Sequence, residues 1–406
     1  MRRVIVALCC SLAAASTVST PSLPQKEAQQ RCLADVKRCD ADAQSGDANA
    51  QYGLGLLYAR GEGGLQQSFK HVAALWKRAA KQDHVHAMRD LGVLYHQGRG
   101  VEADAGDAAR WFRKAADVGD AAAQYTLAVL HGKGKGAERS LEKASAWLRK
   151  AAAQGHDAAC RDLGVLLEQR GDMAGAIAQY RTAAEAPPDG DDYAQYRLAM
   201  IYEDGRGVKR DYAKAAQWHL KAAENGNAMA QYSLGFLYQE GEGVARNLTA
   251  SKRWFHFAAL QKHAGAQYSL AFRYLRGEGT AKNSTAAAHW FGAAAQQGHG
   301  AAQFSVALRY ELGDGVEQNF AVARRWFVEA TGSPSMAASA ALALGKMAMC
   351  GRATKVDGPD YEAATSWLEK CRSFKKPSKE CGYWLAGITW AAPVAGAAAS
   401  PFPCYF

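Results

Sequence analysis

The sequence has little or none of several features that mark catalytic, metal-binding or disordered proteins. Its 9 cysteines form no C-x-x-C pair and its 11 histidines no H-E-x-x-H motif, which argues against zinc and thioredoxin-like redox sites. Proline is scarce, at 10 of 406 residues, whereas 40 residues are glycine, a balance that suits many helix ends and few strands. With 49% hydrophobic and 22% charged residues, the chain is neither disordered nor collagen-like. We therefore expect a folded, largely soluble protein with no bound metal and no cofactor.

Long blocks of one charge are also missing. The formal net charge is +10, yet no run of five or more basic residues occurs, so the sequence does not indicate nucleic acid as a partner. Glycine strings such as Gly132–Gly136 look like phosphate-binding loops in isolation, but no G-K-[ST] follows them. We expect no nucleotide site either.

The N-terminus has the order of a secretory signal peptide, which we place at residues 1–15. Two arginines precede an uncharged run from Val4 to Ala15, whose last three alanines fit a small-residue cleavage site. This run is too short to span about 30 Å of hydrocarbon, so no integral membrane segment is expected. Cys9 and Cys10 suggest lipidation as an alternative, although Leu8 stands where a small residue would be expected. The sequence thus predicts the secretory pathway and a periplasmic or extracellular location, with the endoplasmic reticulum lumen as the alternative.

Removal of this peptide leaves seven cysteines, an odd number, so at least one is unpaired. On one continuous helix, Cys32 and Cys39 would stand roughly 10 Å apart, beyond the reach of a disulfide. Cys371 and Cys381 flank a turn between two helical stretches, and we predict a disulfide between them. The pairing of Cys32, Cys39, Cys350 and Cys404 stays open.

A repeat of about 36 residues runs through most of the chain. Tryptophans recur at intervals of 35 or 36 in two series, Trp76, Trp111, Trp147 and Trp218, Trp254, Trp290, Trp326. The clearest copy reads Ala-Met-Ala-Gln-Tyr-Ser-Leu-Gly-Phe-Leu-Tyr from Ala228, then Gly-Glu-Gly-Val, then Trp-Phe and a pair of alanines. Nine copies start near residues 47, 84, 120, 156, 191, 227, 263, 299 and 333.

Each copy predicts a pair of helices. Apolar residues from Ala230 to Tyr238 keep a helical period, two glycines turn the chain, and a second helical period surrounds Trp254. One such hairpin cannot bury both faces, so neighbouring copies must stack into a solenoid. We expect the tryptophans to pack in its core, with a carbohydrate platform as the alternative. One first-helix position is always small, which points to close backbone approach; it holds Gly55, Gly92, Ala128, Gly164, Ala199, Gly235, Ala271, Ala307 and Gly345.

The pattern A-x-A-Q-Y-x-L-G-x-L-Y-x-x-G-x-G-V, followed by a tryptophan and two alanines, resembles the Sel1-like repeat family over about residues 45–371. The resemblance implies an all-α fold, a right-handed α/α superhelical solenoid of about nine Sel1-like repeats, related to tetratricopeptide repeats. It also implies a scaffold or adaptor that binds protein or peptide partners on the concave solenoid surface. Some disulfide-rich relatives are linked to β-lactam binding, so a β-lactam or other cell-wall hydrolase is the alternative function.

The fourth copy departs from this pattern and divides the array. It lacks the Gly-x-Gly-Val loop, and Pro187-Pro188-Asp189-Gly190 follows it. We expect few contacts across this junction at 187–190, between repeats 1–4 at 47–186 and repeats 5–9 at 191–371. Residues 16–46 are expected to form an N-terminal capping segment, 372–390 a C-terminal capping helix and 391–406 a flexible Ala/Pro tail. An anchor signal is the alternative for this uncharged C-terminus.

Two motifs that suggest catalysis have simpler structural explanations. Ser140-Leu-Glu-Lys143 and Ser373-Phe-Lys-Lys376 match S-x-x-K, but the companion S-D-N and K-T-G motifs are absent. Ser140 stands where a second helix should begin, so we expect it to cap that helix. Because no nucleophile stands beside a base, we predict that the protein is not an enzyme.

Other recurring polar residues are expected to serve the fold. The repeats start with histidine at four surface positions, His84, His156, His263 and His299. Two N-x-[ST] sequons, at Asn247 and Asn283, coincide with expected helix starts, and their glycosylation depends on the source of the protein. Dibasic pairs near the ends of second helices complement the helix dipole, with a polyanion site as the alternative; they are Lys77-Arg78, Arg113-Lys114 and Arg149-Lys150.

Two arginines break the repeat pattern at one first-helix position. Seven of the nine copies hold an apolar residue there, whereas Arg273 and Arg309 occupy it in two consecutive copies. Stacked repeats place equivalent residues roughly 10 Å apart. We predict that these two guanidinium groups bind a carboxylate-bearing partner, with pairing to an intramolecular carboxylate such as Glu311 as the alternative.

Overall fold

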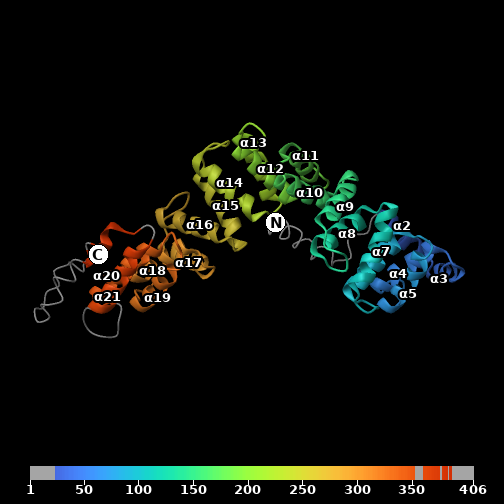
Figure 1. Ribbon diagram of the computed structural model, residues 1–406, viewed down its shortest axis with the longest axis horizontal. Helices are drawn as coiled ribbons and strands as arrows, with labels where there is room; N and C mark the ends of the chain where they lie inside the picture. Colours follow the sequence, from blue (N-terminus) through green and yellow to red (C-terminus); the bar gives the residue numbers. More distant parts are fainter. Residues whose placement is uncertain (1–22, 353–359, 375–376, 383, 386–406) are drawn as a thin grey trace, which may run out of the picture. The chain divides into compact units, whose positions relative to one another are not determined.

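The computed structural model describes residues 23–352, 360–374, 377–382 and 384–385. This part of the chain contains helices and turns and no strand (Figure 1), and none of its helices is long and apolar enough to cross a membrane. The chain divides into two compact units, unit 1 (Met1–Arg210) and unit 2 (Asp211–Phe406). The predicted signal peptide at 1–15 and tail at 391–406 lie outside the described residues.

The helices follow the predicted repeat. Unit 1 contains α2 (Leu23–Ala34), α3 (Val36–Ser45), α4 (Ala48–Arg60), α5 (Phe69–Ala80), α6 (Val85–Gln97), α7 (Ala105–Val118), α8 (Ala121–Lys133), α9 (Leu141–Ala153), α10 (Asp157–Gln169), α11 (Met173–Ala184) and α12 (Asp192–Asp204). Unit 2 contains α13 (Tyr212–Glu224), α14 (Ala228–Glu240), α15 (Leu248–Leu260), α16 (Ala264–Arg276), α17 (Ser284–Gln296), α18 (Gly300–Leu312), α19 (Phe320–Ala330), α20 (Ala337–Met349) and α21 (Tyr361–Ser373). The even-numbered helices from α4 to α20 are the first helices of nine copies. The prediction of an all-α repeat solenoid is confirmed.

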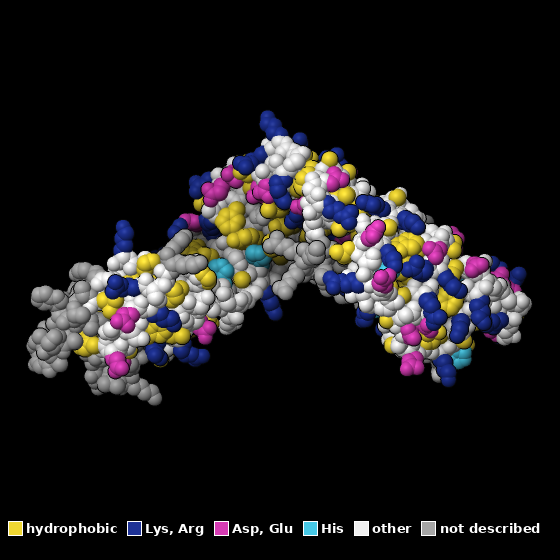
Figure 2. Space-filling model, in the orientation of Figure 1, with side chains coloured by type: hydrophobic (Ala, Val, Ile, Leu, Met, Phe, Trp, Pro, Cys, Tyr) yellow, Lys and Arg dark blue, Asp and Glu magenta, His cyan; other side chains and the backbone are white. Residues whose placement is uncertain are grey.

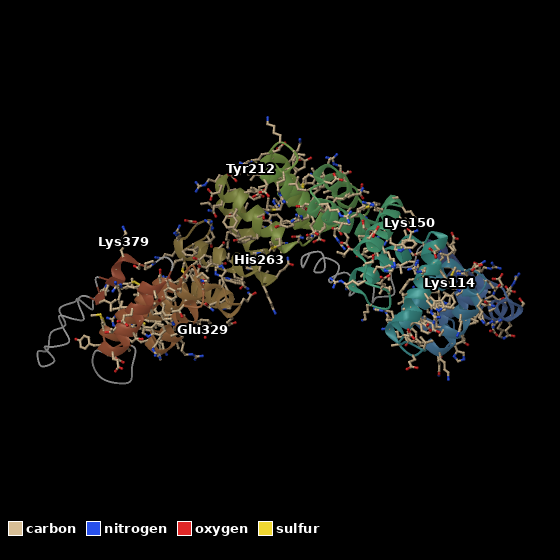
Figure 3. All side chains as sticks on the ribbon, in the orientation of Figure 1. Lys114, Lys150, Tyr212, His263, Glu329 and Lys379 are labelled. Carbon is tan, nitrogen blue, oxygen red and sulfur yellow. A yellow bond between two sulfur atoms is a disulfide. The ribbon has the colours of Figure 1, made fainter. Side chains whose placement is uncertain are left out.

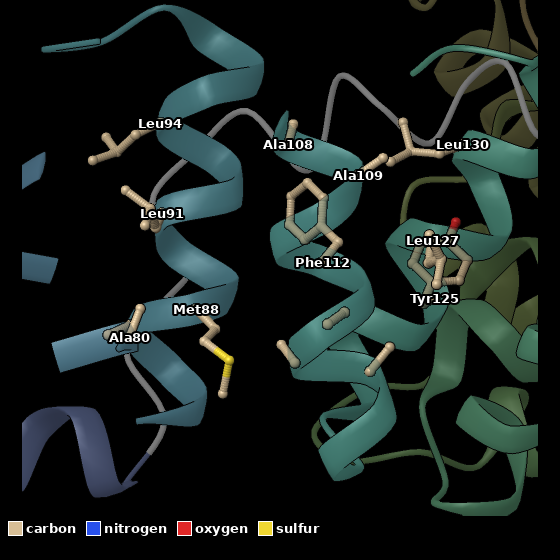
Figure 4. Close-up of a cluster of buried hydrophobic side chains, with 14 of the residues drawn as sticks. Ala80, Met88, Leu91, Leu94, Ala108, Ala109, Phe112, Tyr125, Leu127 and Leu130 are labelled. Atoms are coloured by element: carbon tan, nitrogen blue, oxygen red, sulfur yellow. The ribbon is translucent and has the colours of Figure 1, made fainter. Parts of the chain in front are cut away.

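The core of each pair is one large second-helix side chain lying on the small first-helix position. Figure 4 shows Phe112 of α7 between Leu91 of α6 and Leu127 of α8. A Cβ built on Gly92 would lie 3.1 Å from the Phe112 ring, and one on Gly235 would lie 2.7 Å from the Phe255 ring. The position stays small because a buried side chain occupies the space, whereas the sequence had suggested close backbone approach.

The tryptophans do not fill this core position, so the prediction about them is only partly right. In six copies the residue after the tryptophan is buried: Phe112, Leu148, Phe255, Phe291, Phe327 and Leu368. The tryptophans themselves are mostly half-buried beside it: Trp111, Trp218, Trp254, Trp290, Trp326 and Trp367. Trp76 lies on Gly55 and thus takes the place of Phe112 in its own repeat, because the first loop is one residue longer.

The two glycines of each loop have different tasks. Gly241 ends α14 with a left-handed φ of 78°, and its N–H donates to the Leu237 carbonyl at 2.9 Å. Gly243, with a φ of 70°, lies against the first residue of the preceding second helix, where a Cβ would collide with the Tyr212 carbonyl. The same contact recurs at Gly279 and Gly315 in unit 2. The Gly-x-Gly motif therefore turns the chain and also joins successive repeats.

A buried glutamine joins successive repeats from the inside. Gln231 donates from Nε2 to the Ala223 carbonyl at 3.0 Å and accepts from Gln261 Nε2 at 2.9 Å. Equivalent pairs link Gln51 with Gln82 and Gln124 with Gln154. Each glutamine thereby satisfies a carbonyl near the end of the preceding helix, a group that the helix itself leaves unpaired.

A disulfide closes each described end of the array. Asp35 interrupts the N-terminal helix, which brings the Cα atoms of Cys32 and Cys39 to 5.0 Å in a disulfide. The expectation that these cysteines are too far apart is therefore wrong, because it assumed one continuous helix. At the other end Cys371 is bonded to Cys381, the pair singled out from the sequence, with 6.1 Å between the Cα atoms.

Short segments beyond the repeats cover both ends. A Cβ on Gly53 of α4 would meet the Ala28 carbonyl oxygen of α2 at 2.6 Å, so α2 lies directly on the first repeat. Within the predicted capping helix at 372–390, residues 379–382 and 384–385 are helical, and 386–390 lie outside the described residues. Glu380 of this segment accepts from Lys346 Nζ at 2.8 Å.

The expectation of few contacts across 187–190 is not met. Gln195 Nε2 donates to the Ala184 carbonyl at 3.1 Å, and Arg161 pairs with Asp191 at 2.9 Å. Arg206 and Arg197 both pair with Glu168, on the other side of the junction. Gly190, with a φ of 77°, allows the turn that returns α12 onto α11. The junction lies inside unit 1, and the two units meet in sequence at 210 and 211.

The repeat-start histidines are helix caps rather than ordinary surface residues. His263 Nδ1 accepts from the Ala266 N–H at 3.0 Å, and its ring lies 4.5 Å from the Tyr232 ring. Three other histidines likewise cap the first helix of their own repeat and contact a tyrosine ring of the preceding repeat: His84, His156 and His299. Burial lowers the pKa of all four below the ordinary value of 6.5. The fold therefore favours the neutral ring, which is the form that can accept the capping hydrogen bond.

Replacing Gly235 by valine should lower the free energy of unfolding by about 1–3 kcal/mol, because the new side chain would overlap the buried Phe255 ring. Gly292→Ala is the matched control: this helical glycine has open space around it, so alanine should stabilise by about 0.5–1 kcal/mol. Urea unfolding of the purified chain measures both. A Gly235→Val protein as stable as the parent would contradict the packing described.

Acidification should weaken the histidine caps. A lowered folded-state pKa means that the stabilisation is present above about pH 6.5 and is lost as the pH falls through the folded-state pKa. Between pH 7 and pH 5, the double variant His263→Asn, His299→Asn should lose less stability than the unaltered chain, by about 1 kcal/mol per cap. Asn227 shows that asparagine caps this position, since its Oδ1 accepts from the Ala230 N–H at 2.9 Å. Thermal unfolding at the two pH values is the measurement, and equal losses in both proteins would refute it.

Candidate functional site: the first-helix surface of unit 2

The first helices of unit 2 present equivalent, partly exposed apolar residues in rows. We call this set the first-helix surface, and it comprises Tyr232 and Phe236 of α14, Tyr268 and Phe272 of α16, and Phe304 and Leu308 of α18. Phe236 is 37% exposed, Met229 of the same helix is 46% exposed, and Leu312 at the end of α18 is 51% exposed. Figure 2 shows hydrophobic side chains at the surface around α14 and α15.

Hydrogen bonds and ring contacts hold these rows together. The Tyr232 hydroxyl bonds to Ser269 of the next repeat, and the Tyr268 hydroxyl bonds to Ser305. Burial raises the pKa of both tyrosines despite these bonds, so the hydroxyls stay protonated at neutral pH. The Phe236 ring stands edge-on to Tyr232, with 4.9 Å between centroids. The arrangement is a pre-formed apolar surface whose polar atoms are already satisfied.

The two unusual arginines lie beneath this surface and are paired within the chain. Arg273 is 6% exposed, and it bonds to Glu278 of its own loop and to Gln239 of the preceding repeat. Arg309 pairs in the same way with Asp314. These contacts agree with the alternative of internal pairing, through loop carboxylates rather than through Glu311.

Glu311 interacts with cations other than Arg273 and Arg309. Burial raises the pKa of its carboxyl, while Arg352 and Lys346 act in the opposite direction. Direct binding of a partner by Arg273 and Arg309 remains a prediction. It would require a partner carboxylate to compete with Glu278 or Asp314 for the guanidinium group.

Unit 1 carries buried ion networks that the sequence analysis missed. Arg89 donates to Asp90 at 2.9 Å and to Asp120 at 3.3 Å, and the Tyr52 hydroxyl donates to Asp90 at 2.7 Å. The fourth copy repeats this arrangement with Arg161, Asp162, Asp191 and Tyr125. The sequence signal is an Arg-Asp pair, which replaces the Tyr-x pair of the pattern in the second and fourth copies only.

These networks replace the tyrosine–serine contacts of unit 2. Burial raises the pKa of Asp162, whereas Arg161 and Tyr125 act to lower it. Because Asp120 and Asp191 also cap the following first helices, each arginine ties two first helices together. This first-helix position is thus ionic in two copies of unit 1, on α6 and α10, and aromatic on α14, α16 and α18 of unit 2.

The residues considered for catalysis have structural roles here. Ser140 caps α9, and its Oγ accepts from the Lys143 N–H at 3.2 Å. Ser373 ends α21, and its hydroxyl donates to the Lys370 carbonyl at 2.8 Å. The sequon residues Asn247 and Asn283 cap α15 and α17. Within the described ranges no group of three or more His, Cys, Asp or Glu side chains is placed to hold a metal ion.

Comparisons with known proteins agree with this architecture. The Sel1 repeat model matches eight segments, at 48–84, 85–120, 121–156, 192–227, 228–263, 264–299, 300–331 and 338–370. The fourth copy, which lacks the glycine loop, is the one left unmatched.

Two solved structures share the fold at a similar level. A protective antigen with an SLR fold, present in uropathogenic Escherichia coli strains, is 26% identical with a TM-score of 0.58, and the match covers 91% of each chain. A Sel1 repeat protein from Oxalobacter formigenes is 29% identical with a TM-score of 0.58, over 78% of this chain and 92% of that one. No curated protein matches the sequence significantly. Since the family model covers more than half of the residues, the chain belongs to the Sel1 repeat family.

Proposed function

We propose that the protein is a non-catalytic scaffold that binds a protein or peptide partner on the first-helix surface of unit 2. The observation that carries this proposal is the alignment of partly exposed aromatic residues on three successive first helices, with Phe236 37% exposed. Exposed aromatic residues in a rigid frame supply contact area at a low cost in conformational entropy, which favours them at interfaces. Because the repeats hold these side chains in place, a partner would meet a pre-formed surface.

The proposed compartment is the periplasm or the extracellular space. Two disulfides join residues of the described chain, and disulfides persist in oxidising compartments. The E. coli relative is described as a protective antigen, which suits an exported protein. The capping role of Ser140 argues against the hydrolase alternative, because its hydroxyl already accepts from the Lys143 N–H.

Replacing Phe236 and Phe272 by serine should weaken partner binding at least tenfold, because both side chains are partly exposed on the proposed contact surface. The partner is first captured with the wild-type chain from its native compartment, and the affinity is then measured by calorimetry. Leu260→Ser is the control: this residue is 60% exposed at the end of α15, a second helix of the same unit. Equal affinities of all three proteins would exclude this surface.

Substitutions of Arg273 and of its partner Glu278 should change the stability of the protein by different amounts. Arg273→Leu should change stability by less than about 1.5 kcal/mol, because leucine occupies the equivalent position at Leu237. Glu278→Ala should destabilise by about 1–3 kcal/mol, because it leaves a buried guanidinium without its carboxylate. Denaturant unfolding tests both, and a larger loss from Arg273→Leu would contradict the internal role.

Combining Arg273→Leu with Arg309→Leu tests whether these arginines bind the partner directly. In a folded Arg273→Leu, Arg309→Leu protein, loss of partner affinity would support guanidinium contacts with the partner. Unchanged affinity would restrict both residues to supporting the loops that carry Glu278 and Asp314.

A further inference from the structure

The second helices of unit 1 carry a row of exposed cations at equivalent positions of three successive repeats. We call it the basic row, and it consists of Lys77 and Arg78 on α5, Arg113 and Lys114 on α7, and Arg149 and Lys150 on α9. All six side chains are exposed. Figure 3 labels Lys114 and Lys150 on neighbouring repeats, and Figure 2 shows Lys and Arg side chains across this part of unit 1.

None of these six cations, all within the described chain, is paired with a carboxylate. Arg78 donates to the Ala43 carbonyl at 2.9 Å, and Arg113 lies 3.1 Å from His131 Nε2. The ammonium groups of Lys114 and Lys150 lie over the rings of Trp111 and Trp147, at 4.7 and 4.1 Å from their centroids. Three half-buried arginines of the same unit, Arg89, Arg161 and Arg197, are instead paired with aspartates or glutamates. Positive charge is thus left uncompensated on the outside only.

Helix-end electrostatics does not account for the row. Cations near a helix C-terminus stabilise the helix dipole in any repeat, so the same pairs would be expected in both units. The equivalent positions in repeats 6–8 are instead His256-Phe257, Gly292-Ala293 and Val328-Glu329. The second helices of repeats 5 and 9, also in unit 2, keep a single lysine there, Lys221 and Lys370, each over its tryptophan. Only the paired charge is therefore a property of unit 1.

The composition of the row indicates what it recognises. Lysine precedes arginine in the first pair and follows it in the other two. The three repeats therefore share positive charge at these positions, but they do not share the placement of the planar guanidinium group that binds a carboxylate or phosphate through two hydrogen bonds. The Trp111 and Trp147 rings are covered by lysine and cannot stack on nucleic-acid bases. Val118, on the same helix as Lys114 and one turn beyond it, is 61% exposed. Cations distributed over three helices, beside tryptophan rings and an exposed apolar residue, are the combination expected for binding to an anionic lipid surface.

We propose that the basic row docks unit 1 onto an anionic phospholipid bilayer. Each lysine or arginine near such a surface strengthens binding by about fivefold at moderate ionic strength. The row lies on second helices of unit 1 and the first-helix surface lies in unit 2, so the two sites use different residues. Binding to lipid is therefore independent of the partner proposed above.

The test is co-sedimentation of the full chain with vesicles. Vesicles of phosphatidylcholine with phosphatidylserine or phosphatidylglycerol should bind the protein, and vesicles of phosphatidylcholine alone should not. The variant Lys114→Gln, Arg149→Gln, Lys150→Gln should reduce binding by about 100-fold. It leaves Arg78 and Arg113 unchanged, because these two residues hydrogen-bond within the chain.

A control variant separates the row from net charge. Lys262→Gln, Arg324→Gln, Arg325→Gln removes three exposed cations from unit 2, and binding should fall by less than threefold. An independent measurement uses the unaltered chain: raising the salt to about 0.5 M should release it, since charges at a surface are then screened. Failure of the chain to bind anionic vesicles, or equal losses in both variants, would overturn the proposal. Binding to duplex DNA or an acidic peptide without binding to vesicles would also overturn it.

Discussion

The structure depends on one packing constraint: a large second-helix side chain lies where the first helix has almost no side chain. At Gly92, Gly164 and Gly235 even a Cβ would press on the facing ring, and elsewhere alanine is the largest residue present. A fixed contact of this kind holds the two helices of each pair at one distance. Pairs of equal thickness can stack with equivalent residues in register. This register lets the glutamine and the second loop glycine recur, because each makes the same contact with the preceding repeat in successive copies.

Because this constraint concerns only the inner face, the outer residues can differ between the units. Two first helices of unit 1 carry arginine–aspartate networks where unit 2 has tyrosine–serine contacts. Three second helices of unit 1 end with paired cations, whereas those of unit 2 carry at most one cation at these positions. Such differences are not needed for folding, since either set is compatible with the same core. Departures from the repeat are therefore the best guide to the function of each unit.

Periodicity predicted the helices and the number of repeats well, because both follow from the spacing of apolar residues. It could not separate two adjacent positions that share the same period. The pattern alone favours the tryptophan as the core residue, whereas the structure buries Phe255 and leaves Trp254 half-buried. The ion networks were missed for a related reason. Arg89 and Asp90 look like surface charges in the sequence, and only the stacked repeats show that they pair with each other while Asp120 and Tyr52 contact them from neighbouring repeats.

Local breaks in a helix were the second limit of sequence reasoning. Cys32 and Cys39 are seven residues apart, and their pairing depends on the interruption at Asp35. Likewise, the proline turn at 187–190 predicts a weak junction, but Glu168 forms ion pairs with Arg197 and Arg206 across it. The first error overlooked a break in the helix and the second treated a turn as a loss of contacts, although in both places the change of chain direction brings distant residues together.

The cysteines show how the ends of the array differ from its interior. Terminal repeats lack a neighbour on one side, so part of their packing must be replaced. Here one disulfide lies within the added N-terminal segment, between Cys32 and Cys39, and the other joins Cys371 of α21, in the last repeat, to Cys381 of the added C-terminal segment. Cys160 lies in the interior, where it takes the place of the linking glutamine and donates to the Ala152 carbonyl at 3.6 Å. Burial raises the pKa of its thiol, so it stays protonated and unreactive inside the stack. Covalent bonds thus hold the ends, while packing and hydrogen bonds hold the interior.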